Sequence, residues 1–226
     1  MYRLKFWRDT LEAVYKGNGI VPQQPVATAL LSFCPHSPFD LMDSLATARQ
    51  RTIGDRPFKT LDEVSAYGRD STGALLRLQL HALGYGGGET AVEQAVDGLA
   101  EAYATLNLVR SAGPFTLRRT VLLPLDVLAK HGVTPDNVVS GKKPDELKAA
   151  IQSLVESGSG RLASARALRS QVPRPLRLGF LSVAAQCEHV EKMAKKASFD
   201  IRSTKMQQPR PLLAWRLLAR KWAGTY

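Results

Sequence analysis

The residues of this chain that are able to bind metal ions or act as nucleophiles stand in isolation. No two of the four histidines have the spacing of zinc ligands. Asp40 and Asp43 are three residues apart, but they lie near a proline-bounded helix start, where acids commonly cap the helix. Ser71 and Ser182 lie in no nucleophile-elbow pattern. From these residues we expect no catalytic side chain, no metal site and no cofactor.

The composition is that of an ordinary globular protein. With 226 residues, 44% hydrophobic and 23% charged, the chain is long enough for one sizeable core, and we predict one domain over residues 1–226. No apolar run reaches about 18 residues, so any membrane contact should be peripheral. Cys34 and Cys187 form no disulfide framework, which favours a reducing compartment. The acids Asp9 and Glu12 make the start a poor match to a secretory or transit peptide, so no targeting segment is evident.

The net charge of +11 comes entirely from the last third of the chain. Residues 161–226 hold 14 Lys and Arg against 3 Asp and Glu, whereas residues 1–160 hold 17 of each sign. The basic residues alternate with apolar ones at helical spacing, a pattern typical of a helix lying on a surface. An anionic membrane, an acidic partner or nucleic acid would suit this charge, and so would a solvated face without a partner. No recognised nucleic-acid module accompanies it, so nucleic acid is not expected. The face that we expect to meet a membrane or partner comprises Arg216, Arg220, Lys221 and Trp222.

Helical periodicity runs along the whole chain, and no segment indicates a strand. Thr60 with Glu63, and Thr90 with Glu93, have the spacing of capping boxes at helix starts. Gly113 and Pro114 should end the helix that begins at Thr90, and another should begin behind Pro124. The sequence therefore predicts an all-α bundle. The other helices are expected over residues 2–16, 24–33, 38–51, 61–83, 145–171, 176–199 and 210–222.

The stretch from Asn107 to Val133, NLVRSAGPFTLRRTVLLPLDVLAKHGV, resembles the squalene/phytoene synthase family. The corresponding family segment has the form NILRDxxED, then a basic linker, YLP, and a leucine-rich helix ending in HG. The opening LKFWRDTLEAVYKG and the run QPVATAL are similar to other family segments, so the resemblance extends over nearly the whole chain. It implies the helical bundle of the isoprenoid synthases, and we expect the N-terminal helices of that family, with their acidic motif, to be missing.

The chain departs from the family where its acidic triplet would stand. Ser111, Pro114 and Phe115 occupy those positions. In the synthases the carboxylates hold magnesium against the substrate's diphosphate, and neither Phe nor Pro offers Mg²⁺ an oxygen ligand in its side chain. The resemblance therefore implies a degenerate metal motif and a protein that is no longer an enzyme. The alternative is an active prenyl transferase of the phytoene or squalene synthase kind that uses other ligands.

The resemblance is strongest to a branch of the family that assists assembly of respiratory complex I in mitochondria. That branch has an RRxVxLPxD segment, matched from Arg118 to Asp126, and an ending similar to the WAGTY of residues 222–226. It implies a location at the matrix side of the inner membrane. It also implies contact with complex I subunits or assembly intermediates and with anionic lipid.

Several cations are candidates for binding an anionic group in the place of the ancestral diphosphate. Arg118 and Arg119 have an alternative role, because cations often neutralise the C-terminus of a helix. The tryptophans likewise have an alternative role as core or interface anchors. The candidate anion-binding residues are Arg3, Arg8, Asn107, Arg110, Arg118 and Arg119.

Overall fold

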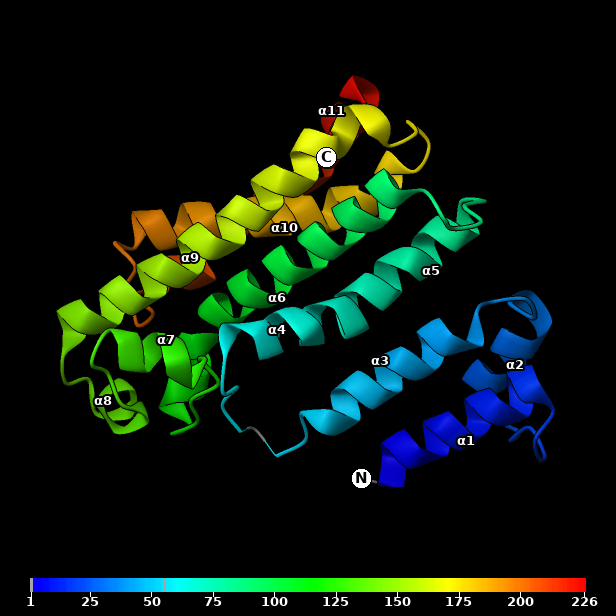
Figure 1. Ribbon diagram of the computed structural model, residues 1–226, viewed down its shortest axis with the longest axis horizontal. Coiled ribbons are helices and arrows are strands. Elements are labelled where there is room, and N and C mark those ends of the chain that lie inside the picture. The colour runs from blue at the N-terminus through cyan, green and yellow to red at the C-terminus, as the bar shows by residue number, and fades with distance from the viewer. Residues whose placement is uncertain (1, 55) are drawn as a thin grey trace.

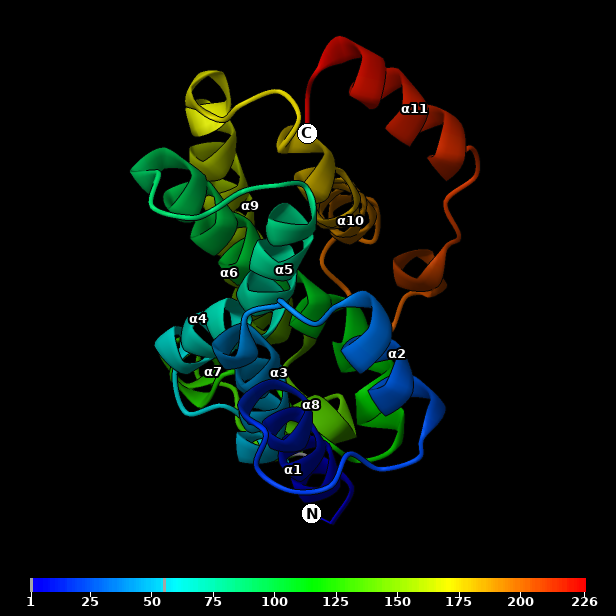
Figure 2. The ribbon, with the colours of Figure 1, turned by 90° about the vertical axis from the view of Figure 1, so that its right-hand side faces the viewer.

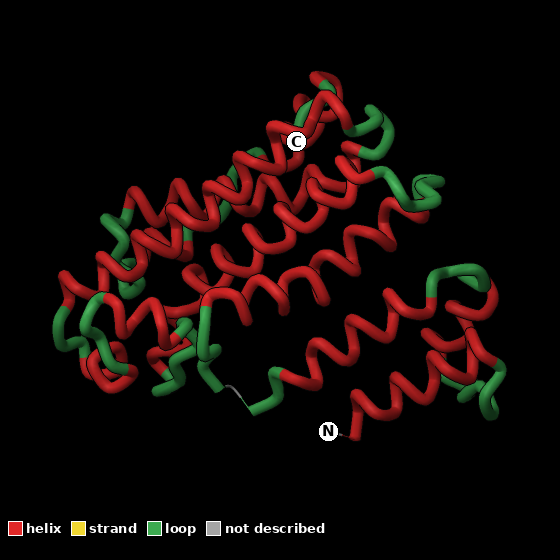
Figure 3. Tube along the Cα trace, viewed as in Figure 1, coloured by secondary structure: helices red, strands yellow, loops and turns green. Residues whose placement is uncertain are grey.

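The computed structural model describes residues 2–54 and 56–226, and the regular elements in these ranges are all helical (Figures 1 and 3). The all-α prediction is confirmed. The α-helices are α1 (Tyr2–Lys16), α2 (Pro25–Phe33), α3 (Phe39–Arg51), α4 (Leu61–Gly68), α5 (Ala74–Ala82), α6 (Thr90–Leu117), α7 (Leu125–Lys130), α8 (Pro135–Ser140), α9 (Pro144–Ala167), α10 (Arg177–Lys196) and α11 (Leu213–Ala223). Three tighter or wider turns accompany them: the π-turn η1 (Arg69–Gly73) and the 3₁₀ turns η2 (Leu168–Gln171) and η3 (Thr204–Gln207).

The long helix α6 is the centre of the bundle. It packs against α4, α9 and α10, and Figure 1 shows it running between α9 and the α4–α5 pair. Leu99 and Leu106 of α6 are fully buried, as are Ile151 and Leu154 of α9 and Phe180 of α10. The three helices α1, α2 and α3 form a separate layer, which reaches the bundle where α3 packs on η1 and α5.

A buried ion cluster ties α6 to its neighbours. The carboxylate of Glu101 on α6 accepts from the guanidinium of Arg69 in η1 and pairs with that of Arg161 on α9. Only 9% of the Glu101 side chain is exposed, whereas those of Arg69 and Arg161 are 43% and 33% exposed, so the carboxylate is buried and the arginines reach the surface. A buried carboxylate needs such compensation, because leaving it unpaired in the core would cost several kcal/mol, roughly 3–5.

The predicted helix over residues 61–83 is interrupted by the π-turn η1. An uninterrupted helix over residues 61–83 would place Leu75 on the same face as the buried Val64, yet Leu75 is 46% exposed, while Leu76 and Leu80 are buried. A π-turn takes an extra residue per turn, so the residues after it are rotated by about one position relative to an uninterrupted α-helix. The π-turn therefore brings Leu76 and not Leu75 to the buried face of α5.

Neither predicted capping box forms in full. Thr60 caps α4, its side-chain oxygen accepting from the backbone N–H of Glu63 at 3.2 Å, but the Glu63 carboxylate accepts from the backbone N–H of Lys59 at 2.7 Å instead of that of Thr60. At α6 the N-cap residue is Glu89, and no side chain caps that helix end. Thr90 is already the first helical residue, and the Glu93 carboxylate instead accepts from Arg77 Nε at 2.7 Å. The ion pair with α5 thus takes the side chain that the capping box required.

The C-terminal segment lies on the outside of the bundle and is held at its far end. Figure 2 shows α11 set apart along the edge of the molecule, and none of its residues is buried. Beyond it, Tyr226 is buried with 3% exposed, its hydroxyl donates to the Ala165 carbonyl at 2.9 Å, and its ring meets Phe180 edge-on. No helix in the described part of the chain is long and apolar enough to cross a membrane.

Candidate functional site

Helix α6 does not end at Gly113 and Pro114, as the sequence predicted, but continues to Leu117. Proline lacks the N–H that would bond to the carbonyl four residues earlier, which is that of Arg110. The side-chain amide of Gln207 in η3 donates to this carbonyl at 2.8 Å and replaces the missing donor. The prediction was wrong because a residue 97 positions away satisfies the group that usually stops the helix.

Gly113 allows the close approach that brings η3 to α6. A Cβ atom at this position would lie 2.1 Å from the carbonyl oxygen of Ile201, a distance that two such atoms cannot adopt. Gly113 is buried and Ile201 is buried with 4% exposed, so the two segments touch through their backbones. We call this region, Arg110 to Leu117 packed against Ile201 to Gln207, the α6–η3 contact.

The three positions that the resemblance assigns to the family's acidic triplet, Ser111, Pro114 and Phe115, all lie within the α6–η3 contact. The hydroxyl of Ser111 donates to the Leu108 carbonyl of its own helix at 3.1 Å, Pro114 is exposed, and Phe115 is half-buried. None of these side chains offers a carboxylate. In residues 2–54 and 56–226, no group of three or more His, Cys, Asp and Glu is placed to hold a metal ion.

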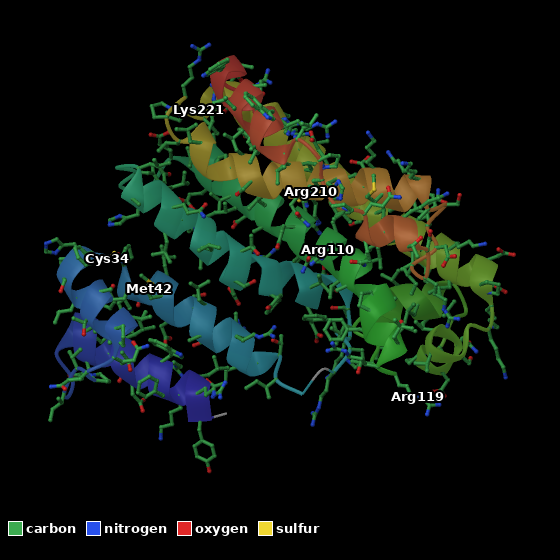
Figure 4. All side chains as sticks on the ribbon, turned by 180° about the vertical axis from the view of Figure 1, so that it is seen from behind. Cys34, Met42, Arg110, Arg119, Arg210 and Lys221 are labelled. Atoms are coloured by element: carbon green, nitrogen blue, oxygen red, sulfur yellow. The ribbon has the colours of Figure 1, made fainter. Side chains whose placement is uncertain are left out.

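Asn107 and Arg110 lie together one turn before this contact. The Asn107 side-chain oxygen accepts from Arg110 Nε at 3.1 Å and from Arg110 Nη2 at 2.9 Å. Figure 4 shows Arg110 beside Arg210, which lies in the segment before α11. Burial and then the positive charge of Arg110 lower the pKa of Arg210. Asn107, Arg110 and Arg210 thus form one cationic group on this side of the bundle.

The other arginines predicted to bind an anion lie elsewhere. Arg118 is the C-cap of α6 and Arg119 follows it, both exposed, at the helix end where the dipole favours cations. Figure 4 shows Arg119 far from Arg110. On α1, Arg3 is exposed and Arg8 Nε donates to Asp43 of α3 at 2.7 Å, a bond that is the main reason for the raised pKa of Arg8. The structure therefore does not bring these four arginines to the Asn107–Arg110 pair.

The expected membrane or partner face is divided between two sides of α11. Trp222 is 80% exposed, and Arg216 and Lys221 are exposed too. Arg220 turns inward, where its guanidinium and that of Arg166 bind the two carboxylate oxygens of Glu188, each at 2.5 Å. The outward stripe consists instead of Leu212, Trp215, Leu218 and Trp222, of which the sequence had singled out only the last as a face residue.

Sequence reasoning missed Gln207 and Arg210, which the fold places against α6. Gln207 lies in the expected linker after residue 199 and Arg210 at the start of the expected last helix, and the stretch KMQQPRP around them matches no motif. Their proximity to Arg110 results from the path of the chain after α10. The only signal available beforehand was the presence of Pro114 inside an otherwise helical pattern, which calls for an outside donor.

The family model for squalene/phytoene synthase matches residues 1–218, and the chain belongs to that family. Among solved structures, the squalene synthase HpnC from Alicyclobacillus acidocaldarius superposes with a TM-score of 0.76, at 18% identity, over 88% of this chain and 75% of that one. A dehydrosqualene synthase in complex with ligand gives a TM-score of 0.78, at 14% identity, over 99% and 78%. The predicted isoprenoid synthase type of bundle is confirmed.

Among curated proteins, the chain is similar to "NADH dehydrogenase (ubiquinone) complex I, assembly factor 6" from Rattus norvegicus. The two are 24% identical over 100% of this chain. The chain spans 67% of the length of that relative.

Proposed function

We propose that this protein assists the assembly of mitochondrial respiratory complex I and does not condense prenyl diphosphates. The observation that carries the proposal is the α6–η3 contact. The positions that correspond to the family's metal-binding acids hold Ser111, Pro114 and Phe115, and the backbone around them is held by Gln207 and by Gly113. Mg²⁺ requires oxygen ligands in near-octahedral order, and these side chains supply only one hydroxyl, which is bonded to its own helix. The similarity to assembly factor 6 supports the same proposal.

The assembly role is tested by deleting the gene in the source organism and measuring complex I on native gels. We expect fully assembled complex I to fall and a smaller intermediate to accumulate, and expect the intact gene to restore assembly. A rescue by a Ser111→Ala variant would agree with a role that needs no metal ligand at this position. Normal complex I in the deletion strain would overturn the proposal.

The second candidate function is prenyl transfer, which the fold itself favours because the matching solved structures are synthases. It is tested with purified protein, Mg²⁺ and farnesyl or geranylgeranyl diphosphate, followed by extraction of the hydrocarbon product. We expect no product. Release of diphosphate together with a condensed hydrocarbon would replace the assembly proposal by an enzymatic one.

We also propose that α11 contacts anionic lipid at the matrix side of the inner membrane. Trp215 and Trp222 are 69% and 80% exposed and lie on one face of the helix. Tryptophan side chains favour the boundary between lipid and water. At helical spacing, Arg216 and Lys221 flank this stripe on its two sides. Each basic residue near an anionic surface contributes about 1 kcal/mol, and the attraction is screened by salt.

The lipid contact is tested by sedimentation with vesicles that contain cardiolipin. We expect the Trp222→Ser variant to bind the vesicles more weakly than the wild type. We also expect higher salt to weaken vesicle binding by the wild type. The matched control is Leu117→Ser, because Leu117 is also an exposed apolar residue, at 88%, but lies at the end of α6. Equal losses for the two variants, or binding that salt leaves unchanged, would contradict the proposal. A competition experiment adds duplex DNA to protein that is bound to the vesicles. If DNA displaces the protein from the vesicles, nucleic acid is the preferred ligand of the basic face.

A further inference from the structure

A cleft of about 450 Å³ lies between α10 and α11 and carries more positive than negative charge. The residues of α10 that line it follow one helical face at intervals of three and four. Opposite them stand residues of α11 and of the segment that leads into it. The lining comprises Ala185, Glu188, His189, Lys192, Arg210, Leu213, Arg216, Leu217, Ala219 and Arg220.

The one carboxylate in this cleft is already neutralised. Both oxygens of Glu188 are bound, one by Arg166 and the other by Arg220. Burial alone would raise the pKa of Glu188, but the hydrogen bonds from Arg220 and Arg166 outweigh it and the pKa is lowered. Glu188 therefore stays ionised at neutral pH, with its charge directed to those two arginines.

Three further cations of the cleft have no such partner. In the described part of the chain, no ion pair involves Lys192, Arg210 or Arg216. The thiol of Cys187 adds no negative charge, because burial raises its pKa to about 12. The balance in the cleft is thus positive, with guanidinium groups whose fixed fork geometry matches phosphate oxygens.

The positive charge of the cleft affects the neighbouring side chain of His189. Its Nε2–H donates to the Gln208 carbonyl at 3.1 Å, so the ring is fixed beside the cleft. Its pKa is lowered, first by burial and then by the charges of Arg210, Arg216 and Lys192. Lys192, Arg210 and Arg216 also line the same cleft as His189, so an anion in the cleft would meet all three cations.

We propose that the cleft between α10 and α11 is a binding site for a phosphate or diphosphate group, held by Lys192, Arg210 and Arg216. Leu213 and Leu217 contribute apolar surface to the lining of the cleft. The lining of this cleft includes none of Ser111, Pro114 and Phe115, although Arg210 also lies beside Arg110, and the proposal does not depend on the assembly role. The same chemistry belongs to a soluble diphosphate and to the headgroup of a phosphomonoester lipid.

The test is calorimetric titration of the purified full chain with inorganic pyrophosphate, without lipid. We expect Lys192→Gln and Arg216→Gln each to weaken binding by about tenfold, the loss of one charge-assisted hydrogen bond. Both side chains are exposed, so the variants should retain the wild-type melting temperature. Lys196→Gln is the matched control, because it removes the same charge from an exposed position on the same helix outside the cleft.

A second readout is the pKa of His189, followed by NMR and assigned with a His189→Gln variant. Pyrophosphate should raise this pKa, because a bound anion offsets the neighbouring cations, and should leave the NMR signals of the His131 ring unchanged. His131 is bonded to Ser153 between α7 and α9 and serves as an internal control. An unchanged His189 pKa, or equal losses of affinity in Lys192→Gln and Lys196→Gln, would overturn the proposal.

The source of the phosphate is decided with vesicles that contain phosphatidic acid. If pyrophosphate displaces the protein from them, and Lys192→Gln weakens the same binding, a lipid headgroup enters the cleft. If neither pyrophosphate nor the Lys192→Gln substitution changes vesicle binding, while pyrophosphate still binds the protein, the ligand is a soluble diphosphate. Either result supports the site, whereas absence of pyrophosphate and vesicle binding in the wild type contradicts it.

Discussion

The α6–η3 contact and the α10–α11 cleft lie on neighbouring parts of the bundle, and the segment from Gln207 to Arg210 connects them. At the α6–η3 contact, the carbonyl that Pro114 leaves without a donor is bonded by Gln207, and Gly113 lets two backbones meet. In the cleft, one carboxylate serves two arginines while three other cations remain without an acid. At the α6–η3 contact, the protein's own groups satisfy the free carbonyl. In the α10–α11 cleft, the unpaired cations are able to bind an anion from outside the protein.

This difference separates a packing role from a binding role. The positions that the resemblance assigns to the acidic triplet take part in a packing contact that stabilises the bundle, and their side chains carry no carboxylate. The positive charge of the last third has meanwhile been placed where acids are scarce. Substitutions in the first region should therefore change the free energy of unfolding, and substitutions in the second should change binding.

The largest expected effect is that of Gly113→Ala. The added Cβ would lie 2.1 Å from the Ile201 carbonyl oxygen, so α6 and η3 must separate, which we expect to cost about 3 kcal/mol. The control is Gly160→Ala in α9, where a Cβ meets nothing within 4 Å and alanine favours the helix by up to ~1 kcal/mol. Urea denaturation measures both. Similar stabilities for the two variants would show that the contact is loose.

Glu188→Gln should have the next largest effect, about 1 kcal/mol at pH 7, because Arg166 and Arg220 lose a shared carboxylate that is 32% exposed. The pKa of Glu188 is lowered in the folded state, so its contribution is present above its ordinary value of 4.5 and is lost as pH falls through the lowered value. The stability difference between wild type and variant should therefore disappear in acid. Asp145→Asn, at a carboxylate 87% exposed, should cost almost nothing at any pH.

Gln207→Leu should destabilise the protein by about 1 kcal/mol, because the Arg110 carbonyl then lacks a donor. The loss should appear as faster amide hydrogen exchange in the last turn of α6. Gln208→Leu is the neighbouring control, since Gln208 is exposed like Gln207 and bonds to His189 through its backbone carbonyl, which the substitution keeps. If both variants exchange alike, the amide of Gln207 does not hold the helix through Pro114.

The smallest effect on stability should come from Trp222→Ser. This side chain is 80% exposed, so its removal should change the free energy of unfolding by less than about 0.5 kcal/mol. Its effect should appear only in vesicle binding. A large loss of stability would mean that Trp222 is a packing anchor and that the outward stripe of α11 is not available to lipid.

Local patterns predicted most of the helices because apolar periodicity and prolines act within a few residues. They failed where distant groups intervene. The end of α6 depended on Gln207, and the capping box at Thr90 was displaced by the Arg77–Glu93 pair. The short helix α8 was missed, although Thr134 and Asn137 form a capping box there. The stripe of α5 was shifted by the π-turn, whose presence no local pattern showed.

The sequence by itself determined the helical class, the family, the absence of carboxylates at Ser111, Pro114 and Phe115, and the excess of basic residues after position 160. These properties depend on residue identity and on spacing along the chain. Only the tertiary structure decided which cations are neutralised, because an ion pair forms between residues far apart in sequence. It joined Arg110 to Arg210 and separated Arg119 from both, and it turned Arg220 inward to Glu188. It also left Lys192 and Arg216 facing a cleft without an acid of their own.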